Sequence, residues 1–232
     1  METLIGKKAI VTGVSRGIGR AVVSHLLERG CQVAGIGRNQ PSFSDSRFHF
    51  AQADIQNEPA VQKAFNNAMT FLENRVDILV NNAGLGYYRL LEDITLDEWH
   101  QMINTNLNGM FYLTRLAVPR MKQQQTGHIV NISSIAGLMG LAESTGYSAT
   151  KFGIRGFSQS LLKEARRDGI RVSCIFPGSV NTDFFENYDA MTANDTMLSS
   201  NDVAATVVYV LSMPPNADVS EVEIRPLNSR SR

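Results

Sequence analysis

The sequence lacks the features that mark several large protein classes. It has only two cysteines, Cys31 and Cys174, which stand far apart without metal-ligand spacing, so we expect two buried free thiols and assign no metal site. Lys and Arg balance Asp and Glu, 22 against 22, which gives no electrostatic reason to expect a nucleic-acid partner. No apolar run approaches the ~18 residues that a membrane span needs. No charged-then-apolar leader precedes the first apolar segment, so we expect a cytoplasmic protein without a membrane partner.

The remaining composition is that of an ordinary globular chain. Hydrophobic residues make up 43% and charged residues 19% of the 232 residues. A chain of this length can bury a large core, and it contains no linker, repeat or low-complexity tract. We therefore expect residues 1–232 to form a single domain.

Short apolar, β-branched runs alternate with helical patterns along the chain. The predicted strands are Ala9–Thr12, Gln32–Gly37, His49–Ala53, Ile78–Asn81, His128–Ser133, Val172–Phe176 and Glu221–Arg225. The predicted helices are Gly17–Arg29, Pro59–Asn74, Leu96–Gln123, Tyr147–Arg167 and Asn201–Ser212. This alternation indicates an α/β fold, a single Rossmann-type doubly wound parallel sheet of about seven strands with helices on both faces. Residues 38–47 are too few for a crossover helix and predict a loop.

Tyr147 and Lys151 are the most informative pair of residues. Their i, i+4 spacing puts them on one face of a predicted helix. An ammonium beside a phenol favours the phenolate and lowers the pKa of the tyrosine, which makes it a usable acid or base. Ser134, thirteen residues upstream of Tyr147, supplies a hydroxyl that can hold a carbonyl oxygen. The three residues together indicate proton transfer to or from a carbonyl or an alcohol.

A glycine-rich segment joins the first predicted strand to the first helix. Gly13, Gly17 and Gly19 form a Gly-x-x-x-Gly-x-Gly pattern, one residue longer than the usual dinucleotide fingerprint. Glycines allow a tight turn and a close approach to a pyrophosphate, and the free N–H groups of the helix start then face the phosphates. The segment therefore predicts a dinucleotide site.

The end of the second predicted strand indicates which dinucleotide binds. An NAD site places Asp or Glu there to bind the ribose 2′-hydroxyl. This strand ends with Gly37, Arg38 and Asn39, and Arg16 lies in the glycine-rich turn. Two guanidinium groups suit a 2′-phosphate, so the sequence favours NADP(H) over NAD(H).

These residues identify a family. The chain resembles the short-chain dehydrogenase/reductase family over nearly its whole length, and it is most similar to the 3-oxoacyl-carrier-protein reductases and small NADP-dependent carbonyl reductases. The matching elements, in order, are Thr12–Gly19, Asp54, Asn81–Gly84, Asn106, Ser134, Tyr147 with Lys151, and Pro177–Gly178. The resemblance implies an enzyme that reduces a ketone, aldehyde or 3-oxoacyl group to an alcohol with a hydride from the nicotinamide.

The resemblance also implies roles for single residues. Tyr147 would be the general acid in reduction, and Ser134 would donate to the substrate oxygen. Lys151 would bind the nicotinamide ribose and keep the pKa of Tyr147 low, and Asn106 would anchor a water that continues a proton relay. The implied cofactor contacts are Gly13, Ser15, Arg16, Gly17, Ile18, Gly19, Arg38, Asp54, Ile55, Asn82, Gly84, Tyr147, Lys151, Pro177, Gly178, Val180 and Thr182. Of these, Asp54 and Ile55 would meet the adenine, and the set from Pro177 onward would surround the nicotinamide.

Three mostly apolar segments flank the expected nicotinamide site and predict substrate contacts. They are Leu85–Tyr88, Ile135–Ser144 with Leu138, Met139 and Leu141, and Phe184–Leu198 with Phe185, Tyr188, Met191 and Met197. The resemblance implies a homodimer or homotetramer that assembles through the helices Leu96–Gln123 and Tyr147–Arg167. Two other functions stay open from the sequence, a non-catalytic dinucleotide-binding redox sensor and a Tyr/Lys epimerase or dehydratase.

Overall fold

Seven parallel strands form one sheet in the computed structural model, which describes residues 2–182, 184 and 194–227. The strands are β1 (Lys8–Thr12), β2 (Gln32–Gly37), β3 (Phe48–Gln52), β4 (Ile78–Asn81), β5 (Gly127–Ile132), β6 (Ile170–Pro177) and β7 (Glu221–Ile224). Their order in the sheet is β3-β2-β1-β4-β5-β6-β7. The strand order reverses between β1 and β4, which is where α/β sheets open a ligand crevice at the carboxyl ends of their strands.

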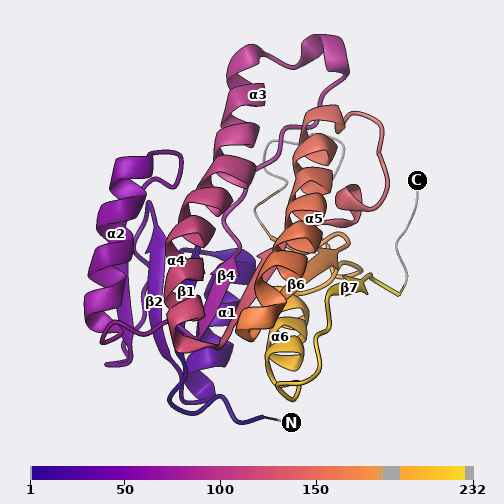
Figure 1. The fold of residues 1–232 in the computed structure, drawn as a ribbon. Coiled ribbons are helices and arrows are strands. Elements are labelled where there is room, and N and C mark those ends of the chain that lie inside the picture. The colour runs from indigo at the N-terminus through magenta and orange to yellow at the C-terminus, as the bar shows by residue number, and fades with distance from the viewer. Residues whose placement is uncertain (1, 183, 185–193, 228–232) are drawn as a thin grey trace.

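Helices cover both faces of the sheet (Figure 1). The main helices are α1 (Gly17–Glu28), α2 (Glu58–Phe71), α3 (Leu96–Ile103), α4 (Met110–Gln124), α5 (Thr145–Ala165) and α6 (Ser200–Leu211). Side chains from α2, α4 and α5 share one core cluster, while those from α1 and α6 share another. This arrangement confirms the predicted doubly wound fold.

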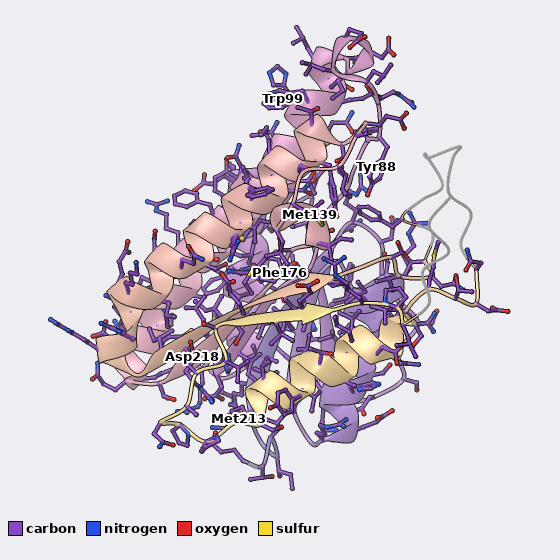
Figure 2. The ribbon with its side chains drawn as sticks, turned by 90° about the vertical axis from the view of Figure 1, so that its right-hand side faces the viewer. Tyr88, Trp99, Met139, Phe176, Met213 and Asp218 are labelled. Atoms are coloured by element: carbon purple, nitrogen blue, oxygen red, sulfur yellow. The ribbon has the colours of Figure 1, made fainter. Side chains whose placement is uncertain are left out.

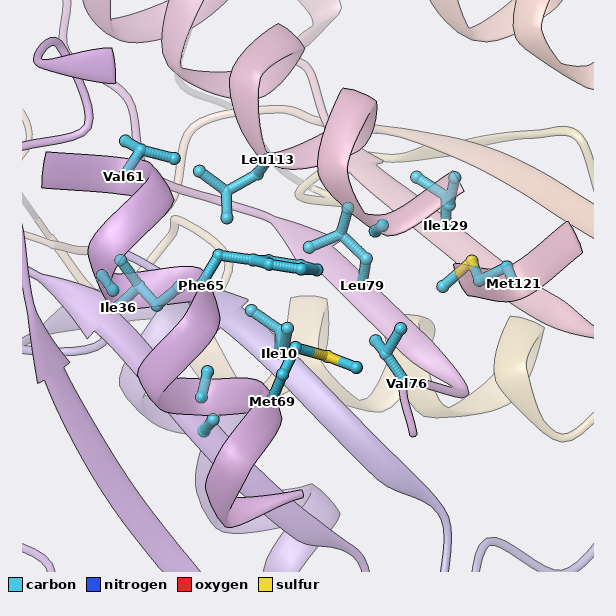
Figure 3. Close-up of a cluster of buried hydrophobic side chains, with 14 of the residues drawn as sticks. Ile10, Ile36, Val61, Phe65, Met69, Val76, Leu79, Leu113, Met121 and Ile129 are labelled. Carbon is cyan, nitrogen blue, oxygen red and sulfur yellow. The ribbon is translucent and has the colours of Figure 1, made fainter. Parts of the chain in front are cut away.

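The strands are buried on both sides because alternate residues enter the two clusters. On β1, Ile10 joins the cluster under α2 and α4, whereas Ala9 and Val11 join the cluster under α1 and α6. Figure 3 shows Phe65 of α2 among Ile10 and Leu79 of the sheet, and all three are at most 2% exposed. Two-sided burial explains why these strands appear in the sequence as continuous apolar runs.

The prediction of one continuous helix over Leu96–Gln123 is wrong. It consists of α3, a π-helical turn over Asn104–Gly109, and α4. A Cβ on Gly109 would lie 2.7 Å from Cδ1 of Ile55, so the wider turn allows its backbone to pack closely on the segment after β3. Sequence periodicity carries no signal for such a tertiary contact.

Other boundaries differ by small amounts, for local reasons. Helix α2 ends at Phe71, before the predicted Asn74, because Glu73 and Asn74 adopt left-handed backbone conformations. Helix α5 gives way after Ala165 to a 3₁₀ turn over Arg166–Asp168. Residues 38–47 contain no helix, as predicted.

The expected free thiols are confirmed. Cys31 and Cys174 are both buried and unpaired in disulfides. Burial raises the pKa of Cys31 to about 11 and that of Cys174 to about 12, which makes both thiols poor nucleophiles. Over the described ranges, no helix combines the length and apolar character that a bilayer crossing requires.

Candidate active site

A cleft of about 590 Å³ opens at the carboxyl ends of the strands, between the glycine-rich turn and the start of α5. Every predicted cofactor residue except Gly19 lines this cleft, as do Ser134, Tyr147 and Lys151 of the predicted catalytic set. Gly19 and Asn106 are not among the residues that line the cleft. In Figure 2, Tyr88 lies toward the end of the sheet to which the strand arrows point, and Asp218 lies toward the other end.

The glycine-rich turn is built for close packing at one end of the cleft. Gly13 has φ +70°, a left-handed conformation that suits glycine. A Cβ on Gly19 would lie 2.1 Å from the carbonyl oxygen of Gly13, so no side chain fits there. Helix α1 begins after Arg16 with no side-chain cap, so its first N–H groups stay available to an anion in the cleft.

Thr12 and Asn82 fix the shape of this turn. Asn82 was predicted as a cofactor contact, but the role of the Thr12 hydroxyl was not identified from the sequence. The hydroxyl of Thr12 accepts hydrogen bonds from the backbone N–H groups of Asn82 and Ala83, both at 3.0 Å. Nδ2 of Asn82 donates to the carbonyls of Thr12 and Gly13 at 2.9 and 3.1 Å. Asn82 therefore holds the glycine-rich turn against the loop after β4, in addition to lining the cleft.

Arg16, Arg38 and Asp54 line the same end of the cleft. Arg38 follows β2 directly, and its carbonyl accepts a hydrogen bond from the amide of Gln52 at 2.9 Å. The Asp54 carboxylate accepts from the backbone N–H of Gln56 at 3.0 Å, which orients it at the end of β3. This end of the cleft is therefore lined by two guanidinium groups, with no carboxylate at the end of β2.

Tyr147 lies at the other end of the cleft and is only 5% exposed. The nearby Ser134 hydroxyl tends to lower the pKa of its phenol, but burial has the larger effect and raises that pKa. Burial also lowers the pKa of Lys151 to about 8. The Lys151 ammonium donates to the carbonyl of Ile132 at 3.0 Å and lies 5.5 Å from the centre of the Tyr147 ring.

The expected effect of Lys151 on Tyr147 is not found in this geometry. The groups that shift the pKa of Tyr147 are its own buried surroundings and Ser134, with no contribution from Lys151. The reason is that the lysine is itself desolvated and directs Nζ at a backbone carbonyl. At neutral pH the phenol is therefore protonated and ready to act as an acid.

Asn106 is bonded to the protein through both ends of its side-chain amide. Its Oδ1 accepts from the N–H of Leu85 at 2.9 Å, and its Nδ2 donates to the carbonyl of Leu85 at 2.8 Å and to the hydroxyl of Thr150 at 2.9 Å. Thr150 in turn donates to the carbonyl of Tyr147 at 2.8 Å. The π-helical turn thus ties the loop after β4 to α5. The water relay through Asn106 stays a prediction.

Only part of the predicted substrate surface can be described. Leu85, Tyr88, Ile135, Leu141 and Phe184 line the cleft near Tyr147. The rings of Tyr88 and Phe184 pack on the Tyr147 ring with centroid distances of 5.5 and 5.7 Å. Three predicted contacts, Phe185, Tyr188 and Met191, lie outside the described residues.

The comparisons with known proteins decide the family. The model of the short chain dehydrogenase family matches residues 7–193. This chain belongs to the short-chain dehydrogenase family. An uncharacterized oxidoreductase of Staphylococcus aureus (strain N315) is 34% identical over 98% of this chain and 100% of its own length. A second uncharacterized oxidoreductase, from Staphylococcus epidermidis, is 31% identical over 95% of this chain and 97% of its own.

Solved structures of other proteins share this fold. The closed form of a serine dehydrogenase complexed with NADP+ superimposes with a TM-score of 0.88 at 30% identity, over 97% of this chain and 100% of the other. An alcohol dehydrogenase from the archaeon Thermococcus sibiricus complexed with 5-hydroxy-NADP gives 0.86 at 25% identity, over 97% and 99%. The chain is thus an oxidoreductase of this family.

Proposed function

We propose that the protein reduces a carbonyl group to an alcohol with NADP(H), with Tyr147 as the proton donor. The observation that carries this proposal is that Ser134, Tyr147 and Lys151 line one cleft together with the uncapped start of α1. When bound, the nicotinamide would supply a hydride to the carbonyl carbon. The chain has all four residues of the predicted catalytic set, Asn106, Ser134, Tyr147 and Lys151. Their presence favours an enzyme over a non-catalytic redox sensor.

The protein's own groups handle the oxygen and the proton. The hydroxyls of Ser134 and Tyr147 can both donate to the substrate oxygen, where negative charge develops during reduction. Burial keeps Tyr147 protonated until that charge appears, because the raised pKa disfavours a free phenolate. Tyr147 then transfers its proton to the oxygen, which completes the alcohol.

Lys151 and the glycine-rich turn would hold the cofactor. The Lys151 ammonium faces Gly84 in the cleft, since a Cβ placed on that glycine would lie 3.7 Å from Nζ. We assign it the nicotinamide ribose. The N–H groups at the start of α1 suit the pyrophosphate, and the guanidinium groups of Arg16 and Arg38 suit a 2′-phosphate. Pro177, Gly178, Val180 and Thr182 line the same cleft beyond β6 and are assigned to the nicotinamide end.

Titration with NADPH and NADH tests the cofactor assignment. We expect NADPH to bind more tightly, because charge-assisted hydrogen bonds to the 2′-phosphate contribute about 1.5–3 kcal/mol each. Arg38→Ala should therefore weaken NADPH binding by roughly tenfold to a hundredfold and leave NADH binding nearly unchanged. Cofactor fluorescence measures both affinities. Arg120→Ala, at an exposed site on α4, is the matched control, and equal affinities in the wild type would contradict the assignment.

We also infer a homo-oligomer that assembles through α4 and α5. Phe111 on α4 and Phe152 on α5 are large apolar side chains that are 45% and 43% exposed. An assembly through these helices would cover both rings. Light scattering should give a dimer or tetramer mass in the wild type and a smaller mass for Phe152→Glu, and a monomer mass for the wild type would overturn the inference.

A further inference from the structure

The catalytic end of the cleft has apolar walls that come from three separate segments. The loop after β4 supplies Leu85 and Tyr88, the segment after β5 supplies Ile135 and Leu141, and Phe184 follows β6. These side chains surround Tyr147, whose hydroxyl marks where the substrate oxygen must lie. The group attached to the reacting carbonyl therefore lies against these walls.

Two aromatic rings are held firmly in this surface. Tyr88 and Phe184 are tilted by 48° and 54° against the Tyr147 ring, an ordinary geometry for packed aromatic side chains. The backbone leaves no spare volume at Gly86. A Cβ there would lie 2.9 Å from Cδ2 of Tyr147 and 3.2 Å from Cζ of Phe184. The walls thus offer a closely packed, apolar and aromatic surface beside the reacting group.

Positive charge is scarce around this end of the cleft. The sequence has no Lys or Arg between Lys122 and Lys151, and none between Arg171 and Arg225. Both stretches include a wall segment, and the wall segment Leu85–Tyr88 has no charged residue. Lys151 lines the cleft, but it is 5% exposed and donates to the carbonyl of Ile132.

The cations that flank the walls are already paired with acids. Arg89, which follows Tyr88, lies 3.6 Å from the Glu98 carboxylate. Arg225, at the end of β7, forms an ion pair with Glu223 and contacts the sulfur of Met139. The wall segments themselves carry acids, among them Glu143 two residues after Leu141. Among the described residues, the cations that flank the walls are paired with acids and Lys151 donates to a backbone carbonyl, so a carboxylate bound beside Tyr147 would lose its water without a dedicated ion pair.

We propose that this site selects carbonyl compounds whose neighbouring group is uncharged and apolar, such as an aromatic ring, and rejects compounds with a carboxylate next to the carbonyl. The proposal rests on the carbonyl-reductase function above and narrows its substrate class. Burying an unpaired carboxylate is costly, whereas an aromatic or similar flat group gains from contact with Tyr88 and Phe184. The serine dehydrogenase of similar fold is named for an amino acid, and the charges of this chain argue against such a substrate here.

Three related ketones test the proposal in NADPH oxidation assays on the wild-type protein. Phenylglyoxylate carries the carboxylate, while phenylglyoxylamide and methyl phenylglyoxylate keep the ketone and the ring without the charge. We expect kcat/KM for the acid to be roughly a hundredfold below that for the amide, because a buried polar group without a partner discriminates by at least that factor. Equal values for acid and amide, or a preference for the acid, would overturn the proposal.

A charge introduced into the wall provides a second test. Leu141 lines the cleft and is 42% exposed, so a longer polar side chain can replace it without entering the core. Leu141→Lys should raise the acid-to-amide ratio of kcat/KM by about tenfold relative to Leu141→Gln, which matches it in polarity but not in charge. An unchanged ratio would contradict the electrostatic cause of the selection.

The two proposals fail in different ways. If the amide, the ester and a panel of other ketones and aldehydes leave NADPH unconsumed although NADPH binds, the reductase function itself is wrong. If the neutral ketones are reduced and the acid is reduced equally well, the reductase function stands and only the substrate class is wrong. Tyr147→Phe, assayed with the amide, confirms that the measured rate comes from this site.

Discussion

Tyr147→Phe is expected to lower kcat for carbonyl reduction by roughly 10²–10⁴-fold, the usual contribution of a positioned general acid. The substitution removes the proton that completes the alcohol and one of two donors to the developing oxyanion. NADPH affinity should change little, because the phenylalanine ring keeps the packing of Tyr147 against Tyr88 and Phe184. Steady-state kinetics and cofactor titration measure the two effects separately.

Tyr209→Phe is the matched control for this experiment. Tyr209 lies on α6, is 46% exposed and does not line the cleft. Loss of its hydroxyl should leave kcat within about twofold, the range of ordinary surface changes. Retained turnover in Tyr147→Phe would mean that another group donates the proton.

Lys151→Ala is expected to reduce both kcat and NADPH affinity, because we assign the lysine to the nicotinamide ribose beside Tyr147. A charge-assisted hydrogen bond contributes about 1.5–3 kcal/mol, so the affinity should fall by roughly tenfold to a hundredfold. Lys163→Ala, exposed on the same helix, should have neither effect. A loss of rate with unchanged affinity would show that Lys151 does not hold the ribose.

The lysine also gives the reaction a pH dependence. Burial lowers the pKa of Lys151 to about 8, so the free protein loses this charge as the pH rises through about 8. NADPH affinity should therefore decline above that pH in the wild type and stay nearly flat in Lys151→Ala. The contribution of Lys151 to stability changes with pH in the opposite direction. Between about pH 8 and the ordinary value of 10.5 the unfolded chain binds more protons, so the free energy of unfolding contributed by this group rises with pH.

The parts of the site that depend on local sequence were predicted well. The seven strands and the glycine-rich turn follow from hydrophobic runs and glycine spacing, and Ser134, Tyr147 and Lys151 do converge on one cleft. The hydroxyl of Thr12 and that of Thr150 were missed because their partners are 70 and 44 residues away in the sequence. A threonine beside a motif gives no signal of which distant backbone it will bind.

The direction in which the pKa of Tyr147 shifts could not be predicted from the sequence, for a different reason. Helical spacing places Lys151 near the phenol, but it does not say how deeply either group is buried. In the folded protein, desolvation raises the pKa of Tyr147 and lowers the pKa of Lys151. Both groups therefore favour their neutral forms. Such a balance depends on the packing of Tyr88 and Phe184 on the Tyr147 ring, which only the tertiary structure reveals.

The π-helical turn between α3 and α4 determines how the side chains of α4 are rotated about the helix axis relative to those of α3. Each residue of an α-helix turns the chain by about 100°, so one surplus residue in a wide turn shifts everything after it by that angle. Met102, before the turn, packs in the cluster around Tyr147, and Leu113, after it, packs in the main core under the sheet. Both are fully buried. In an uninterrupted helix these two residues, eleven positions apart, would point within about 20° of each other, so the surplus residue turns them toward two different clusters.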